Sequence, residues 1–301
     1  MSIQNVVLIG GGVLGSQIAY QTAYKGFHVT IWLRSDASIG RAQPKLQRLH
    51  DIYVAELTAA KSSPGPYSPG LLDNGRTYTP EEIDGRIAQA DAALAGLTLT
   101  TDLAGAVKDA DLVIEALAEV PQEKIEFYQK LAPLLPEKTI LATNTSTLLP
   151  SSLAQYTGRP EKYLALHFAN NIWKQNTAEV MGHPGTDPAA YEEVAQFAAD
   201  IGMVPLRLKK EKNGYLLNSM LVPFLMAAQS LWAEDIADFE TIDKTWVLAT
   251  GAPMGPFRIL DIVGITTAYN ILTNNPAAAD PNTTYGKMAK RLKEEYIDTG
   301  K

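Results

Sequence analysis

The sequence predicts two domains, an α/β domain built on a mostly parallel sheet and an all-helical domain after it. Three observations lead to this prediction. Short apolar runs alternate with helical patterns as far as residue 207, the order expected when helices cover a parallel sheet. The first unit of this kind holds a glycine-rich turn between a strand and a helix. From Asn213 onward no convincing strand follows, so we place the domains at residues 1–207 and 208–301.

Length and composition limit the class of protein. The chain has 301 residues, enough for two domains, and its net charge of −7 argues against a nucleic-acid partner. The absence of cysteine excludes disulfides and thiolate ligands, and we expect no metal site. The N-terminus lacks the features of a signal peptide, and the apolar stretch LVPFLMAAQSLW is too short to span a bilayer. We therefore expect a cytoplasmic protein without a membrane partner.

Residues 5–33 read as strand, glycine turn, helix and strand. The turn has the spacing G-x-G-x-x-G. Gly10 permits the tight turn, Gly12 lets the backbone approach a pyrophosphate, and Gly15 lets helix and strand pack closely. The N-terminus of the helix adds unpaired N–H groups for the phosphates. This context predicts a Rossmann-like dinucleotide site whose contacts include Gly10, Gly12, Val13, Leu14 and Gly15.

The end of the second strand indicates which dinucleotide is bound. Such folds usually place an acidic residue there to bind the adenosine ribose. Here the strand ends at Leu33, which cannot accept a hydrogen bond, and Arg34 and Ser35 follow at once. Because the guanidinium fork suits phosphate, we expect NADP(H) to be favoured over NAD(H). The alternative is that Asp36 binds the ribose while Arg34 stacks on the adenine.

Residues 39–60 and 79–96 show helical patterns on either side of the turn-rich segment 61–78. They predict a helical hairpin inserted into the α/β domain, in a position to lean over a ligand. Lys61 and Arg76 are candidate contacts for phosphate groups of a substrate, with solvated surface charge as the alternative for each.

Sheet character then returns in the segments DADLVIEAL, KTILATNTS, KYLALHF, TAEVM and MVPLRL, with helices near 121–135 and 188–201. His167 ends an apolar strand, where open α/β sheets place their ligands. A buried structural histidine is the alternative. Glu179 lies in a segment that can run beside that strand and would fix the tautomer of His167. Ser146 follows another strand end, and Asn218 lies on an otherwise apolar helical stretch.

Several motifs in one order resemble the L-3-hydroxyacyl-CoA dehydrogenase family over almost the whole chain. They are GGGVLGSQIA, ADLVIEALAEVPQEK, ILATNTSTL and GAPMGPFRILDIVG, together with LHFANN where the family has His-Phe-Phe-Asn-Pro. The spacings also agree, with 21 residues from Ser146 to His167 and 12 from His167 to Glu179. The chain departs from the family pattern at Asn171, which replaces the proline, and at Ser219, which replaces an arginine.

The resemblance implies hydride transfer between a nicotinamide cofactor and C3 of an acyl-CoA, with 3-hydroxybutyryl-CoA and acetoacetyl-CoA favoured. It implies that His167 is the general acid/base, that Glu179 orients it, and that Ser146 and Asn218 bind the substrate oxygen. Histidine, with an ordinary pKa of about 6.5, suits proton transfer near neutral pH. The remaining implied contacts are Asn170 and Lys61 on the substrate side and Ala116, Glu119, Lys124 and Asn144 on the cofactor side.

The resemblance also implies a homodimer formed through the C-terminal domain, whose segment YLLNSMLVPFLMAAQSLW is apolar for a small domain. Two alternatives to the acyl-CoA reaction stay open. The first is the same fold and chemistry on a small free hydroxy acid, as in gulonate or carnitine dehydrogenases. The second is a relative without catalytic activity that binds nucleotide or serves a structural role.

Overall fold

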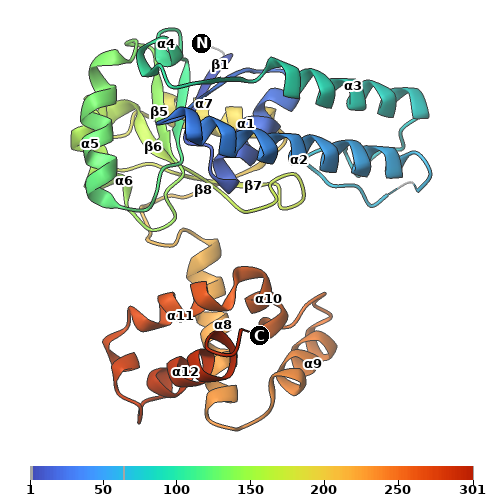
Figure 1. Cartoon of the computed structure of the whole chain (residues 1–301), viewed down its shortest axis with the longest axis vertical. Coiled ribbons are helices and arrows are strands. Elements are labelled where there is room, and N and C mark those ends of the chain that lie inside the picture. Colours follow the sequence, from blue (N-terminus) through green and yellow to red (C-terminus); the bar gives the residue numbers. More distant parts are fainter. Residues whose placement is uncertain (1–2, 64, 301) are drawn as a thin grey trace. The chain divides into compact units, whose positions relative to one another are not determined.

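The computed structural model describes residues 3–63 and 65–300. The chain separates into two compact units, Met1–Tyr215 and Leu216–Lys301 (Figure 1). The boundary lies later than the one at residues 207 and 208 that the sequence suggests. The intervening segment returns to the sheet, where Leu208 and Tyr215 pack with Ala165 and Met181. The α/β fold followed by a helical unit is confirmed.

An eight-stranded sheet forms the centre of the first unit, in the order β3-β2-β1-β4-β5-β6-β7-β8. Every neighbouring pair is parallel except β6 and β7, which are antiparallel. The edge strand β3 is not predicted from the sequence, because its three residues are too few to show a pattern. The strands are β1 (Asn5–Ile9), β2 (His28–Trp32), β3 (Thr98–Thr100), β4 (Leu112–Glu115), β5 (Ile140–Thr143), β6 (Tyr163–Phe168), β7 (Thr177–Met181) and β8 (Val204–Arg207).

Helices cover both faces of the sheet, because successive strand residues point to opposite faces. Val6 and Leu8 of β1 join the core beneath one set of helices, and Val7 and Ile9 join the core beneath the other. The first set comprises α1 (Val13–Tyr24), α2 (Asp36–Ala60), α3 (Pro80–Gly96) and α7 (Pro188–Asp200). The second comprises α4 (Leu103–Val107), α5 (Pro121–Leu131) and α6 (Pro150–Leu153). Short 3-10 turns cover 132–134, 154–156 and 160–162.

Helices α2 and α3 form the predicted hairpin and lie side by side (Figure 1). Their connecting segment folds back on the unit, because Leu71 and Leu72 are buried in its core. The backbone N–H of Gly70 donates to the carbonyl of Trp173 at 2.8 Å. A Cβ at Gly70 would lie 2.7 Å from the Trp173 Cα, so this close approach needs glycine. The connection is therefore tied to the segment between β6 and β7.

The second unit is helical, with Trp232, Ile242, Leu272, Met288 and Leu292 in its core. It contains α8 (Leu217–Ala233), α9 (Phe239–Thr250), α10 (Pro256–Val263), α11 (Ile265–Thr273) and α12 (Thr284–Leu292), with a 3-10 turn at 276–279 and a π-helical turn at 293–297. No helix within residues 3–63 and 65–300 is both long and apolar enough to cross a membrane.

Candidate active site

The glycine loop joins β1 to α1 at the carboxyl edge of the sheet. Gly10 has a φ of +105°, and a Cβ there would meet the carbonyl oxygen of Ala116 at 2.8 Å. A Cβ at Gly15 would lie 2.5 Å from the carbonyl oxygen of Gly10. Gly12, the N-cap of α1, instead faces open space, and Val13 beside it is 63% exposed. A closed turn beneath an open helix N-terminus fits the phosphates of a dinucleotide.

The residue directly after β2, Leu33, points its apolar side chain inward. Leu33 is only 4% exposed, and its Cδ2 lies 2.9 Å from where a Cβ of Gly11 would be. Arg34 and Ser35 are exposed beside it. Ser35 is the N-cap of α2, and its hydroxyl accepts from the Ser38 N–H at 3.3 Å. Leu33 therefore packs against the glycine loop, while Arg34 and Ser35 face solvent.

Two further cations of α2 join this region. The guanidinium of Arg41 donates to the Ser38 hydroxyl at 2.7 Å. The ammonium of Lys45 donates to the carbonyl oxygen of Gly11 at 3.2 Å, next to the glycine loop. Sequence reasoning missed both residues, although their positions one and two turns into the helix were a usable signal. Arg34, Arg41 and Lys45 thus lie around the N-terminus of α2, together with the exposed Asp36 in its first turn.

The register of the antiparallel pair β6 and β7 sets His167 directly opposite Glu179. Nδ1 of His167 lies 2.9 Å from Oε2 of Glu179, and a hydrogen bond of 3.1 Å joins Nε2 to the Ser146 hydroxyl. His167 and Glu179 are 7% and 3% exposed. With Nδ1–H donating to the carboxylate, Nε2 is left facing the Ser146 hydroxyl.

Tyr215 completes the surroundings of the histidine. Its ring stacks on the imidazole, with centroids 4.4 Å apart and planes inclined by 13°. The phenol donates to the carbonyl of Thr145 at 2.7 Å, and burial raises its pKa, so it stays protonated. The φ of Tyr215 is +51°, a left-handed conformation that is rare for an aromatic residue. Nothing in its polar sequence neighbourhood signals this role.

The Ser146 loop is held from below by Glu119. Its carboxylate accepts from the N–H groups of Ser146 and Thr147 at 3.0 and 2.8 Å, and also from the Thr145 hydroxyl. Burial raises the pKa of Glu119, but the hydrogen bonds from Thr145 and Thr147 and the nearby Lys124 charge hold it below its usual range. The carboxylate therefore stays ionised as a fixed acceptor for the loop.

Lys124 is buried, and its ammonium lies 2.6 Å from Glu115 and 3.7 Å from Glu119. Tyr128 and Thr143 also donate to the Glu115 carboxylate, at 2.6 and 2.8 Å. This buried network supports the floor of the site. The predicted contacts of Glu119 and Lys124 with the cofactor stay predictions.

The remaining predicted residues are placed as follows. Asn144 ties β5 to β6, because its Oδ1 accepts from the Phe168 N–H at 3.1 Å. Asn170 is exposed in the segment after β6, close in sequence to His167. Asn218 belongs to the second unit, where it lines a small cavity with apolar side chains of α8, α10 and α11. Lys61 forms an ion pair with Asp84 across the helical hairpin.

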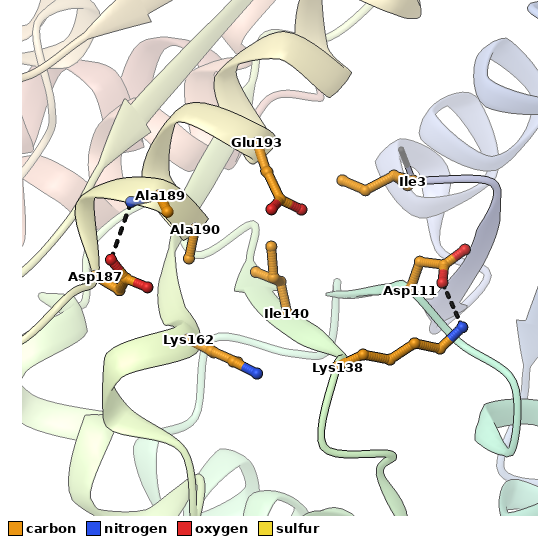
Figure 2. A pocket seen from close by; sticks show the side chains of 9 residues that line it. All are labelled: Ile3, Asp111, Lys138, Ile140, Lys162, Asp187, Ala189, Ala190 and Glu193. Carbon is orange, nitrogen blue, oxygen red and sulfur yellow. Dashed lines mark hydrogen bonds and ion pairs between the residues drawn. The ribbon is translucent and has the colours of Figure 1, made fainter. Parts of the chain in front are cut away.

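A second cavity, of about 130 Å³, lies at the opposite edge of the sheet, at the strands' amino ends (Figure 2). Lys138 pairs with Asp111 at 2.5 Å there, and Asp111 also accepts from the backbone N–H groups of Gln4 and Asn5 at the start of β1. Asp187 caps α7 by accepting from Ala189 at 3.0 Å. These charged groups pair with one another or bind strand and helix ends.

Comparison with known proteins agrees with this geometry. The family model described as 3-hydroxyacyl-CoA dehydrogenase, NAD binding domain, matches residues 5–67 and 72–212, and that of the C-terminal domain matches 214–301. The mitochondrial hydroxyacyl-coenzyme A dehydrogenase of Homo sapiens is 31% identical over 265 residues, which are 88% of this chain and 77% of that protein.

Two solved structures are also similar. A diketoreductase described with the dual catalysis of dicarbonyl compounds is 49% identical, with a TM-score of 0.86 over 100% of this chain and 95% of the other. FadB2 of M. tuberculosis is 28% identical, with a TM-score of 0.77 over the same shares of the two chains. The NAD-binding match indicates a nicotinamide dinucleotide as cofactor. The protein is an oxidoreductase that belongs to the 3-hydroxyacyl-CoA dehydrogenase family.

Proposed function

We propose that the protein interconverts short-chain 3-hydroxyacyl-CoA and 3-oxoacyl-CoA compounds, with 3-hydroxybutyryl-CoA and acetoacetyl-CoA as the first candidates. The observation that carries this proposal is the Ser146–His167–Glu179 arrangement, with distances of 3.1 and 2.9 Å. It provides a proton donor and acceptor at one nitrogen and a fixed carboxylate at the other. This is the machinery that a carbonyl needs when it becomes an alcohol.

Bound nicotinamide supplies or accepts the hydride at C3. In the direction of reduction, Nε2 of His167 gives a proton to the substrate's 3-oxygen, and in oxidation it takes that proton back. The Glu179 carboxylate stabilises the imidazolium that exists while the proton is held. The Ser146 hydroxyl lies beside Nε2 and hydrogen-bonds the same oxygen. Asn218 is proposed as a second partner of that oxygen.

We also propose that the preferred cofactor is NADP(H). Arg34 and Ser35 are exposed at the end of β2, and the Arg41 and Lys45 side chains lie around the following helix N-terminus. A 2′-phosphate carries a charge that these groups complement, whereas Leu33 offers no acceptor to a free 2′-hydroxyl. The glycine loop, through Gly12 and Val13, serves the pyrophosphate in either dinucleotide.

A second candidate is reduction of a dicarbonyl compound that carries no CoA. The 49% identity to the diketoreductase, well above that to the acyl-CoA enzyme, favours it. Both candidates place a ketone two carbons from another carbonyl group, so His167, Glu179 and Ser146 serve either without change. They differ in whether a CoA moiety contributes binding, for which Lys61 is the proposed contact.

A substrate panel tests the proposal. Acetoacetyl-CoA, ethyl acetoacetate, free acetoacetate and free 3-hydroxybutyrate are each assayed with both cofactors, with His167→Gln as the inactive control. A kcat/KM at least tenfold higher for acetoacetyl-CoA than for the other oxo compounds supports the acyl-CoA reaction. Equal or higher values for ethyl acetoacetate support the second candidate. No turnover with any of these compounds would overturn both.

We further propose a homodimer formed through the second unit. Ile236, Leu248 and Ile262 are each about 70% exposed there, and Trp246 is partly exposed. A groove of about 480 Å³ between α8 and α9 is lined almost entirely by apolar groups, including Phe224 and Trp246. Apolar surface of this kind commonly marks a protein–protein contact.

A further inference from the structure

Gln17 is a buried amide on the helix that follows the glycine loop. It lies one turn beyond Val13 in α1 and is 6% exposed. Its Oε1 accepts from the backbone N–H of Asn171 at 2.8 Å and, more weakly, from that of Ile172 at 3.4 Å. These two N–H groups belong to the segment between β6 and β7, directly after Asn170.

The turn that Gln17 holds has an unusual backbone. Asn171 has a φ of +57°, and its carbonyl accepts from the N–H groups of Lys174 and Gln175 at 2.8 and 2.9 Å. Asparagine is among the few residues that tolerate this conformation. The turn thus presents its carbonyl to its own chain and its N–H groups to Gln17.

The later half of the segment is anchored separately. The Trp173 indole N–H donates to Glu56 of α2 at 3.0 Å, and its carbonyl accepts from Gly70. The earlier half, which carries Asn170, is instead held by the Gln17 side chain, which accepts from the N–H groups of Asn171 and Ile172. The family motif places proline at position 171, and proline has no N–H to donate. The shorter of the two hydrogen bonds to Gln17 is therefore possible only because Asn171 departs from that motif.

We propose that Gln17 is a positioning residue that holds segment 170–172, and with it Asn170, in place for the substrate. This rests on the proposed function and on the expected contact of Asn170 with the substrate. The N-terminus of α1 would meet the dinucleotide phosphates, and Gln17 lies one turn further along the same helix. One rigid helix would therefore position both the cofactor and the segment that carries Asn170. Loss of the Gln17 acceptor should therefore weaken substrate binding and spare cofactor binding.

Gln17→Met removes the acceptor at nearly constant volume, and Gln17→Glu keeps a side-chain oxygen at the same reach. Hydrogen–deuterium exchange of the Asn171 and Ile172 amides measures the contact without substrate. KM for acetoacetyl-CoA or ethyl acetoacetate, whichever the wild type reduces, measures its effect, and NADPH fluorescence titration measures cofactor affinity. Asn171→Gly, which keeps both the N–H and the left-handed backbone, is the matched control.

Gln17→Met should speed exchange of both amides at least tenfold and raise KM about tenfold, the size expected for losing one to two hydrogen bonds. NADPH affinity should stay within twofold, and Gln17→Glu and Asn171→Gly should remain within about threefold of wild type in exchange and KM. Unchanged exchange, unchanged KM, or a parallel loss of NADPH affinity would overturn the proposal. If Gln17→Met does not fold, Gln17→Asn, whose oxygen falls short of the turn, replaces it. A wild type inactive on every probe refutes the proposed function alone, since amide exchange still decides the Gln17 contact.

Discussion

Replacing Arg34 by glutamine should lower the use of NADPH relative to NADH with little disturbance of the fold. Arg34 is exposed, and within the described residues its guanidinium takes part in no hydrogen bond or ion pair. The neighbouring Leu33 is a poor target, because Leu33→Asp would bury a carboxylate against Gly11 in the core. Arg34→Gln therefore changes the charge at the proposed 2′-phosphate position and leaves the glycine loop intact.

The expected magnitude follows from the kind of bond that is lost. A hydrogen bond to a charged group contributes about 1.5–3 kcal/mol, and solvent screening at an exposed site reduces this. We therefore expect a loss of about 1.4–2 kcal/mol, or roughly 10- to 30-fold in kcat/KM for NADPH. The value for NADH should change less than twofold. Because Arg41 and Lys45 remain, the preference for NADPH should fall rather than reverse.

The assay is steady-state kcat/KM for each cofactor at saturating carbonyl substrate, in low salt and in roughly 0.5 M salt. The effect should shrink in high salt, because screening weakens exposed charge pairs. Arg48→Gln, which removes another exposed positive charge further along α2, is the matched control and should leave the ratio unchanged. A wild-type preference for NADH, or a ratio that Arg34→Gln leaves within twofold, would refute the reasoning about the end of β2.

Three further predictions concern catalysis, pH and assembly. His167→Gln should lower kcat at least about 100-fold at unchanged NADPH affinity, and near-normal turnover in a folded variant would remove its acid/base role. Burial, with repulsion from Arg86, lowers the pKa of Lys25 to about 8. The unfolded chain therefore binds more protons from about pH 8 to 10.4, so stability rises across that window. Lys25→Met should raise the free energy of unfolding at pH 7 by up to about 3 kcal/mol, with a gain that shrinks by pH 10; equal gains at both pH values in urea unfolding would contradict this. Sedimentation should give a dimer at micromolar concentration that Leu248→Glu weakens, whereas a wild-type monomer would exclude the interface.

The parts of the site that sequence predicts are those encoded in short local patterns. Gly10, Gly12 and Gly15 reveal the glycine loop by their spacing, and a Cβ at Gly15 would meet the Gly10 carbonyl of the same turn. The pairing of His167 with Glu179 follows from two apolar strands close in sequence. In both cases the chain segments that meet are joined by few residues, so spacing alone carries the information.

The parts that sequence misses depend on packing between distant segments. Tyr215 reaches His167 only because the segment after β8 returns to the sheet, and nothing in KEKNGY indicates that path. In the sequence Gln17 is one more residue of the helix after the glycine loop, although its partner lies far along the chain. The orientation of Leu33 is hidden for the same reason, since the contact with Gly11 decides that its side chain turns inward.

The reversal of direction between β6 and β7 constrains how this enzyme can change. His167 faces Glu179 through strand pairing, with Leu166 opposite Val180 and Phe168 opposite Ala178 on the other side of the sheet. A shift of this pairing by one residue would exchange the two faces of β7 and bring an apolar side chain opposite the histidine. Insertions in segment 169–176 are therefore tolerated only if they lengthen the loop and leave the register of β6 and β7 unchanged. Under the proposed function, sequence changes in the loop between these strands can alter substrate binding while the pairing of His167 with Glu179 stays intact.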